Sequence, residues 1–328
     1  MSEEQKTAFV TGATGAVGTA LVRRLVGEGW RVTALHRRSS DTTTLRELGV
    51  GLVEGDVADT DLRGKVPVGT RVVFHTAADM NLWRRHNARQ EAVNVGGTRN
   101  IVEAALQAGV QRFIHTSTVS AYGRHNEPIS EDTPSNAGQS WISYERTKWL
   151  GEQEVRRGLD RGMEVVIINP SAVMGPGFTA GWTMLLRQLK AGQMKALPPG
   201  WVVVNHIADV VDAHVAAVTK ARSGHNYILT GDNLPFAELI AHAAQVMGIE
   251  LKAKVMSAGL MMAVARIGDF FSNFTGREPA LTPEMAALMS QKLVLHTDKA
   301  KRELGYRETP WRVCVEEMYR WLHDRGGI

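Results

Sequence analysis

Tyr144 and Lys148 are the two side chains of this sequence whose types and spacing most clearly allow chemistry. Four residues apart on a helix, they project from one face about one turn from each other. A tyrosine with an ordinary pKa near ~10 is a weak acid–base catalyst at neutral pH, and a positive charge beside it favours the phenolate. Such a pair can exchange a proton with a carbonyl or alcohol oxygen. The same spacing also occurs where a packed aromatic ring merely lies beside a surface charge.

A run of hydroxyl side chains, within His115–Ser120, precedes this pair by about two dozen residues. The run follows the apolar segment Arg112–Thr116, which has the composition of a buried strand. Polar groups at the carboxyl end of a parallel strand lie at the crevice where such sheets bind ligands. The hydroxyls and the Tyr144–Lys148 pair are therefore expected to meet at one site.

A glycine-rich turn, Thr11–Gly18, stands between the first apolar run and a helical run that reaches about Val26. Glycines at this spacing let the backbone turn sharply and approach a pyrophosphate, while free N–H groups at the helix start face the anion. An ordinary glycine-rich turn is the alternative. If the turn binds a dinucleotide, its contacts are expected from Gly12, Thr14, Gly15, Ala16, Val17 and Gly18.

The choice of dinucleotide depends on the residues that end the second strand, Leu35–Ser40. An NAD site usually places an acid there to hold the ribose hydroxyls, and this segment has none. Arg37, with Arg38 or Ser39, could instead pair with the 2′-phosphate of NADP, although solvated arginines on a loop are the alternative. Asp56 could accept from the adenine amine or could cap a helix. We therefore expect NADP(H), with NAD(H) as the alternative.

The elements that must position these residues alternate between short apolar runs and longer helical patterns through the first half of the chain. This rhythm is typical of a Rossmann-type, doubly wound parallel sheet in an α/β protein. The expected strands are Ala8–Thr11, Arg31–Leu35, Gly51–Glu54, Arg71–His75, Arg112–Thr116 and Val165–Asn169.

After Pro170, glycine and proline clusters and mostly helical spacing indicate a smaller substrate-binding domain, residues 171–328. The dinucleotide domain would be residues 1–170, with 201–230 returning to it. In that returning segment Val202–Val204, a helix over 208–221 and Tyr227–Leu229 are expected to add to the main sheet.

Composition excludes several other classes of protein. The net charge of +4 comes from scattered basic residues, so nucleic-acid binding is not expected. The single cysteine, Cys314, cannot form an internal disulfide, and the histidines lack metal-ligand spacing, so no metal is expected. Met1–Lys6 lacks a signal-peptide core, and Ala258–Phe271 falls short of a membrane span. These features favour a cytoplasmic enzyme for small molecules.

The chain resembles the extended short-chain dehydrogenase/reductase superfamily over nearly its whole length. Within that superfamily it is most similar to the dihydroflavonol 4-reductase-like and 3β-hydroxysteroid dehydrogenase-like branch. The motifs that carry the resemblance are Thr11–Gly18, Gly55–Val57, His75–Ala78, Asn94–Asn100, Thr116–Gly123, Tyr144–Lys148, Asn169–Ser171 and His206–Val210; those typical of the branch are Ala77–Trp83, Asn169–Pro176 and Thr275–Thr282.

The resemblance implies a role for each site residue. Thr118, with Ser117 in reserve, would hydrogen-bond the reacting carbonyl, Tyr144 would donate the proton, and Lys148 would bind the nicotinamide ribose and lower the tyrosine pKa. Other cofactor contacts are implied for Val57, Ala77 and Ala78, and the carboxamide would be fixed by Pro170, Ser171 and Val173. Asn81 and Trp83 could border the substrate alongside Thr118 and Tyr144, although a loop tryptophan can equally be packing.

Three functions fit these residues. The first is an NADP(H)-dependent carbonyl reductase or alcohol dehydrogenase acting on a ketone or aldehyde. The second is a nucleotide-sugar epimerase with a recycled cofactor, for which Arg187, Lys190 and Lys195 could hold a diphosphate. The third is an NADP-sensing protein on the same fold. The resemblance also implies a homodimer.

Overall fold

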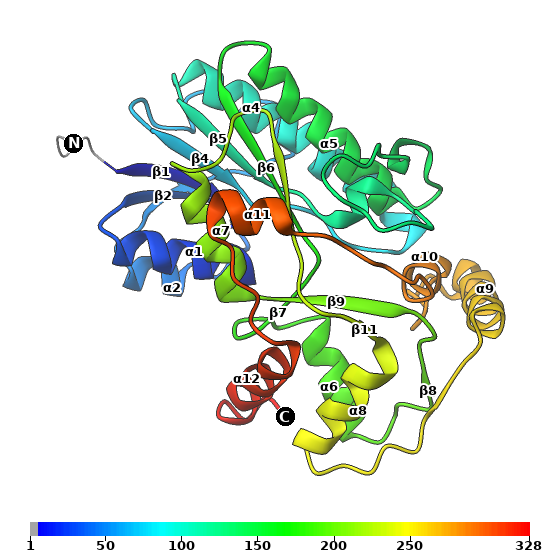
Figure 1. The fold of residues 1–328 in the computed structure, drawn as a ribbon. Helices are drawn as coiled ribbons and strands as arrows, with labels where there is room; N and C mark the ends of the chain where they lie inside the picture. Colours follow the sequence, from blue (N-terminus) through cyan, green and yellow to red (C-terminus); the bar gives the residue numbers. More distant parts are fainter. Residues whose placement is uncertain (1–5) are drawn as a thin grey trace.

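A computed structural model describes residues 6–328, so the expectation for Met1–Lys6 lies almost wholly outside the described residues. The main sheet has seven strands, all parallel, and contains each of the six strands expected in the first half of the chain (Figure 1). The Rossmann-type fold is thereby confirmed. Across the sheet the order is β10 (Asn226–Leu229), β6 (Glu164–Pro170), β5 (Arg112–Thr116), β4 (Val72–His75), β1 (Thr7–Thr11), β2 (Arg31–His36) and β3 (Gly51–Glu54).

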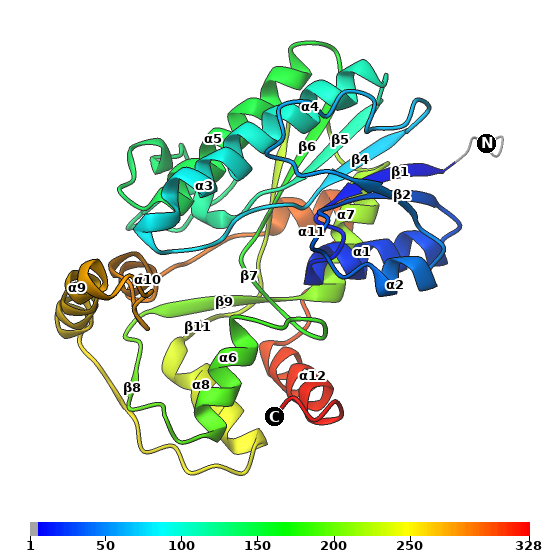
Figure 2. The same cartoon turned by 180° about the vertical axis from the view of Figure 1, so that it is seen from behind.

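Helices cover both faces of this sheet (Figures 1 and 2). One face carries α1 (Ala16–Gly27), α2 (Thr43–Glu47), α7 (Ile207–Ala217) and α11 (Asp298–Leu304); the other carries α4 (Thr98–Gln107) and α5 (Ser143–Leu159). Successive side chains of a strand point to opposite faces. In β6, therefore, Val166 and Ile168 enter the first core, whereas Val165 and Ile167 enter the second.

Short helical segments surround the carboxyl edge of the sheet. Helix α3 (Asn87–Glu91) runs through a π-helical stretch (Ala92–Gly97) directly into α4. A Cβ on Gly151 of α5 would lie 2.7 Å from the Asn94 carbonyl oxygen, so this glycine allows α5 to pack tightly against the π-helical stretch. The remaining short segments are the 3-10 helices Arg84–His86, Val119–Tyr122 and Ala137–Gln139.

The segment that returns to the main sheet differs in part from the expectation. Helix α7 packs against α1, and β10 pairs with β6, as expected. The strand at Val202–Val204 exists, as β9 (Trp201–His206), but it does not join the main sheet. It pairs instead with β7 (Ala172–Met174) and β11 (Asn233–Pro235) in a separate three-stranded sheet.

The rest of the C-terminal part is mostly helical, as expected. A separate core lies between β9 and the helices α6 (Trp182–Lys190), α8 (Phe236–Val246) and α12 (Trp311–His323), and it includes the fully buried Cys314. A two-stranded pair, β8 (Ala196–Leu197) and β12 (Lys254–Val255), lies near them. Helices α9 (Ala258–Thr275) and α10 (Pro283–Leu288) pack on each other. Within residues 6–328, no helix combines the length and apolar character needed to cross a bilayer.

Candidate active site

The glycine-rich turn joins β1 to α1 at the carboxyl edge of the main sheet. Gly12 has a φ of +69°, and a Cβ on it would lie 2.6 Å from the Ala77 backbone nitrogen. A Cβ on Gly18 would lie 2.1 Å from the Gly12 carbonyl oxygen, so α1 rests directly on the turn. Helix α1 follows Gly15 with no capping side chain from the described residues and no acid in its first turn. Its first N–H groups therefore suit a pyrophosphate.

The structure brings Tyr144, Lys148 and Thr118 together. Helix α5 presents the tyrosine and the lysine one turn apart, and the Lys148 Nζ donates to the Thr116 carbonyl oxygen at 2.9 Å. Thr118 lies just beyond the end of β5, where its Oγ1 accepts from the Ser120 backbone nitrogen at 3.2 Å and its hydroxyl interacts with the Tyr144 phenol. A phenol, a hydroxyl and an ammonium group thus meet at one strand end.

Burial shifts the pKa of both members of the pair. It lowers the pKa of Lys148 to about 8, and the negative charge of Glu152 acts against this fall. Burial raises the pKa of Tyr144, and the hydrogen bond with Thr118 opposes the rise. In the structure the pKa of Tyr144 is therefore raised, not lowered, and the expected lowering by Lys148 stays a prediction.

Glu152 is a site residue that the sequence reasoning missed. It follows Lys148 by one turn of α5 and is only 5% exposed. Its carboxylate accepts from the side-chain amides of Asn169 at 2.7 Å and Asn226 at 3.1 Å. Asn169 also donates to the Thr118 carbonyl oxygen at 3.1 Å. The signal that could have revealed Glu152 is the second four-residue step after the Tyr144–Lys148 pair.

Three buried histidines lie behind the lysine. His75 and His214 are hydrogen-bonded to threonine hydroxyls at 2.7–3.0 Å, one of them that of Thr116. His115 stacks on His75 with ring centroids 5.2 Å apart, and neither of its ring nitrogens has a partner among the described residues. Burial lowers the pKa of His75 to about 3, that of His214 to about 4, and that of His115 well below 6.5. All three are neutral at pH 7, so none of them adds a positive charge beside Lys148.

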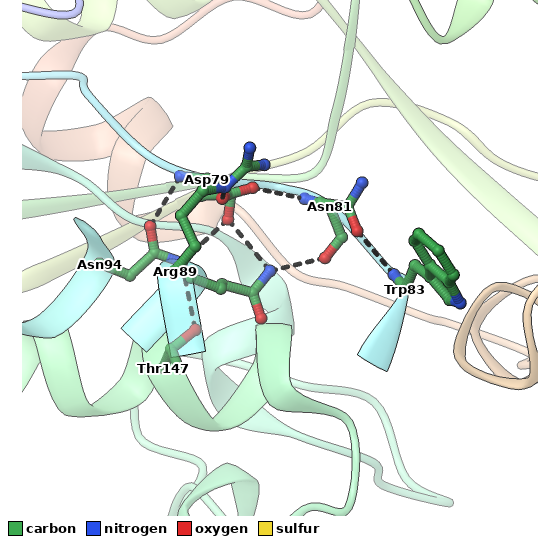
Figure 3. A network of polar contacts seen from close by, with 7 residues as sticks. Asp79, Asn81, Trp83, Arg89, Asn94 and Thr147 are labelled. Atoms are coloured by element: carbon green, nitrogen blue, oxygen red, sulfur yellow. Dashed lines mark hydrogen bonds and ion pairs between the residues drawn. The ribbon is translucent and has the colours of Figure 1, made fainter. Parts of the chain in front are cut away.

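The loop after β4 is held by the polar network in Figure 3. The Asp79 carboxylate accepts from the Asn81 backbone nitrogen at 3.0 Å, and Asn81 Oδ1 accepts from the Trp83 backbone nitrogen at 2.7 Å. Asn94 accepts from the Asp79 backbone nitrogen at 2.8 Å and donates to Thr147 Oγ1 at 3.1 Å. The network therefore ties this loop to α5, next to the tyrosine–lysine pair.

Asn81 and Trp83, which the sequence places at the border of the substrate, are partly used to build this loop. The Asn81 oxygen is used within the turn, and Trp83 is 6% exposed, with Arg85 over its ring at 5.3 Å. The Trp83 Nε1 is buried without a partner among the described residues. These contacts support the packing alternative for Trp83, while substrate contact by either residue stays a prediction.

The residues expected at the adenosine end of the cofactor lie near the glycine turn. Arg37 is exposed just past β2, whose Leu35 pairs with Thr11 of β1. Asp56 Oδ1 accepts from the Ala58 backbone nitrogen at 3.0 Å within a turn, and no helix begins there, so the helix-capping alternative is wrong. The carboxylate is partly exposed, and its contact with the adenine stays a prediction. Val57 is buried in the core.

The residues expected at the nicotinamide end lie at the ends of β4 and β6. Ala77 and Ala78 follow β4, and Pro170 ends β6. The backbone nitrogen and Oγ of Ser171 donate to Asn205 Oδ1, at 2.8 and 2.6 Å. Val173 lies in β7. Within residues 6–328, no cluster of three His, Cys, Asp or Glu side chains is arranged to hold a metal ion.

Comparisons with known proteins agree with this arrangement. The profile of the NAD-dependent epimerase/dehydratase family matches residues 8–229. The chain is 30% identical to a protein of Synechocystis sp. provisionally named a dihydroflavonol 4-reductase, over 98% of this chain and 95% of that protein. It is 31% identical to the sterol demethylase protein B of Methylococcus capsulatus, over 98% and 100% of the two chains. The crystal structure of gox2253 superposes with a TM-score of 0.84 at 32% identity, covering 99% and 100%.

The family match covers more than half of the chain, and it spans the glycine turn, the Tyr144–Lys148 pair and the seventh strand of the sheet. Relatives named as reductases and dehydrogenases match nearly the whole chain or its larger part. The protein therefore belongs to the NAD-dependent epimerase/dehydratase family of extended short-chain dehydrogenases/reductases and is an NAD(P)-dependent oxidoreductase.

Proposed function

We propose that the protein is an NADP(H)-dependent carbonyl reductase or alcohol dehydrogenase that acts on a ketone or aldehyde. The observation that carries this proposal is the meeting of Tyr144, Thr118 and Lys148 at the carboxyl end of β5, on the sheet edge that also carries the glycine turn. Ligands of open α/β sheets bind at this edge. A reductase name borne by one near full-length relative is a second support.

In this proposal Tyr144 donates its phenolic proton to the substrate carbonyl oxygen, and the Thr118 hydroxyl hydrogen-bonds the same oxygen. The bound nicotinamide supplies the hydride for reduction and accepts it in the reverse direction. Lys148 contributes positive charge beside the phenol, which favours the phenolate after the proton has left. The main contributions of the protein are the positions of these groups and their electrostatics.

The cofactor would lie across the sheet edge. The glycine turn and the start of α1 would hold the pyrophosphate, Arg37 the 2′-phosphate, and the backbone from Pro170 to Val173 the carboxamide. We keep the division at residue 170 into cofactor-binding and substrate-binding parts, with the return to the first part beginning at α7. A homodimer stays a prediction.

The epimerase alternative has less support. It needs free basic side chains for a diphosphate, and Arg187 of α6 donates its Nε to the Gly327 carbonyl oxygen at 2.8 Å. Lys190, in the same last turn of α6, and Lys195, which follows the helix, are exposed. Within the described residues, none of these three side chains has a hydrogen bond or ion pair with Tyr144, Lys148 or Thr118.

The test is the absorbance of NADPH and NADH with a panel of ketones, aldehydes and nucleotide sugars. Wild-type protein is expected to consume NADPH with a carbonyl substrate. Tyr144→Phe removes the proton donor and should lower turnover by about 10²–10⁴-fold without loss of cofactor binding. Tyr319→Phe, on the distant α12, serves as the matched control and should leave turnover unchanged. Cofactor binding without net consumption, together with epimerisation of a nucleotide sugar, would contradict the reductase.

A further inference from the structure

Helix α9 turns its apolar side outward. Its inward residues Met261, Ala265 and Ser272 are 5% exposed or less. Residues on the opposite side recur at intervals of three and four and thus share one face. Helices of water-soluble folds normally show the reverse pattern. The exposed apolar side chains are Leu260 (55%), Val264 (45%), Ile267 (59%), Phe270 (58%), Phe271 (58%) and Phe274 (75%), which we call the α9 outer face.

The α9 outer face lies at an extremity of the molecule. In both views α9 is the outermost element at one end, with α10 beside it on the inner side, and it is far from the C-terminal helix α12 (Figures 1 and 2). The three phenylalanines pack on one another, with ring centroids 5.3–5.7 Å apart around Phe270. They therefore form one contiguous aromatic patch. Contiguous exposed patches of this kind mark interaction sites.

Exposed basic residues outnumber exposed acids around this face. Arg266 is exposed on α9 beside the apolar stripe, and Lys254 precedes the helix. Arg277 follows the helix next to the exposed Glu278, and Lys252 is paired with Glu250 at 3.3 Å. The acid within the helix, Asp269, is partly buried and paired with Arg84 at 3.1 Å. An apolar face with aromatic rings, bordered by Lys and Arg, has the chemistry of a helix that lies in the plane of a membrane surface. The border would attract anionic lipid headgroups.

We propose that the α9 outer face binds the surface of an anionic lipid bilayer, with its aromatic side chains inserted at the headgroup level and the flanking cations against lipid phosphates. Binding of this kind needs no helix that spans the bilayer, and no helix of the described residues is long and apolar enough to do so. A second copy of the chain fits the α9 outer face less well than a lipid surface does. In a twofold antiparallel pair of α9 helices, residues near the midpoint meet their own copies, so each Arg266 would face the other.

Docking by α9 has a consequence for the site. Arg84 donates to Asp269 and to Asn273 at 2.7 Å, and Arg85 donates to the Ser272 carbonyl oxygen at 3.2 Å. These bonds join α9 to the loop after β4, on which Met80 is 66% exposed. A bilayer-bound enzyme would therefore hold that loop near the lipid. This consequence rests on the proposed function and makes lipophilic carbonyl compounds, drawn from the bilayer, the expected substrates.

The experiment is co-sedimentation of the full chain with vesicles of phosphatidylcholine, with or without phosphatidylglycerol, in the absence of cofactor and substrate. Wild-type protein is expected to bind the phosphatidylglycerol vesicles and to be released by high salt. The triple variant Phe270→Ser/Phe271→Ser/Phe274→Ser should bind at least about tenfold more weakly. Because these side chains are exposed, its unfolding midpoint should match that of the wild type. Met184→Ser, 59% exposed on α6, is the matched control and should bind normally.

Two further measurements keep the proposal falsifiable. Arg266→Gln/Arg277→Gln should lose the preference for anionic vesicles. Wild-type protein that stays in the supernatant with both vesicle types would overturn the proposal. So would a triple variant that binds vesicles normally but turns a dimer into a monomer in light scattering, because the face would then be a contact between copies. Since no turnover is measured, neither result bears on the proposed reductase activity.

Discussion

At the scale of single residues, Arg37 is the side chain on which the proposed cofactor preference depends. It is exposed just beyond β2, the strand that pairs with β1 before the glycine turn. Charge-assisted hydrogen bonds to a phosphate contribute about 1.5–3 kcal/mol each. Arg37→Ala is therefore expected to weaken NADPH binding by about 10–100-fold in a fluorescence titration and to leave NADH binding nearly unchanged. Arg38→Ala is the neighbouring control, and an unaltered ratio of the two affinities would remove Arg37 from the site.

Glu152 is expected to tune the site without touching substrate or cofactor. Its charge raises the pKa of Lys148, which burial holds at about 8. Without that charge, the lysine would lose its proton at lower pH, and the positive charge beside Tyr144 would be lost with it. Glu152→Gln should thus move the alkaline limb of the kcat/KM profile to lower pH. The same limb must be compared at saturating cofactor, so that cofactor affinity does not affect the profile.

Glu154 offers a matched control for this prediction. It lies on the same helix and is also 5% exposed, but it pairs with Arg99 at 2.8 Å and Arg157 at 2.7 Å. Glu154→Gln is expected to lower stability without moving the pH profile. If both variants shift the profile equally, or if neither does, Glu152 is a structural residue only.

At the scale of elements, the close contact between α1 and the glycine turn makes a sharp prediction. A Cβ on Gly18 would overlap the Gly12 carbonyl, whereas a Cβ on Gly27, at the other end of α1, would meet nothing within 4 Å. Gly18→Ala should cost about 1–3 kcal/mol in the free energy of unfolding and weaken NADPH binding, because α1 must move away from the turn. Gly27→Ala should be neutral or stabilising by up to about 1 kcal/mol. Urea unfolding and cofactor titration of both variants provide the test.

The sequence predicted those elements whose signal is local. Strands buried on both faces of a parallel sheet read as continuous apolar runs, so all six early strands were recognisable. The pair Tyr144 and Lys148 was recognisable because four residues on a helix fix a common face. Val202–Val204 shows where local signals fail: it is a strand, but its partners β7 and β11 come from distant segments, which decide the sheet it joins.

The rest of the site depends on contacts between distant segments. Glu152 of α5 has two partners, Asn169 on β6 and Asn226 on β10. No spacing in the sequence links these two residues to α5. Helix α9 is similar, since nothing in its sequence alone decides which of its sides is buried. Packing on the short α10 and bonds from Arg84 fix the side that faces outward.

At the scale of the whole molecule, the buried histidines link stability to pH. His75, His115 and His214 have a folded pKa below their ordinary value. Between about pH 4 and 6.5, His75 and His214 are neutral in the folded protein and protonated in the unfolded chain, and His115 acts in the same direction below pH 6.5. The unfolded state then binds more protons, and the free energy of unfolding falls as pH falls from 7. Each histidine contributes a slope of up to about 1.4 kcal/mol per pH unit. The raised pKa values of Glu131 and Glu284 act in the opposite direction.

A variant comparison isolates the histidine contribution, because the glutamate contribution is common to all variants. His115→Phe removes two buried nitrogens that lack partners, so it should stabilise the protein at pH 7 by about 1–3 kcal/mol. It should also flatten the decline below pH 6.5, since one proton fewer is taken up on unfolding. The measurement is urea unfolding across this pH range. If the free energy of unfolding of His115→Phe falls with pH as steeply as that of the wild type, the assignment is wrong. His115 would then titrate in the folded protein as it does in the unfolded chain.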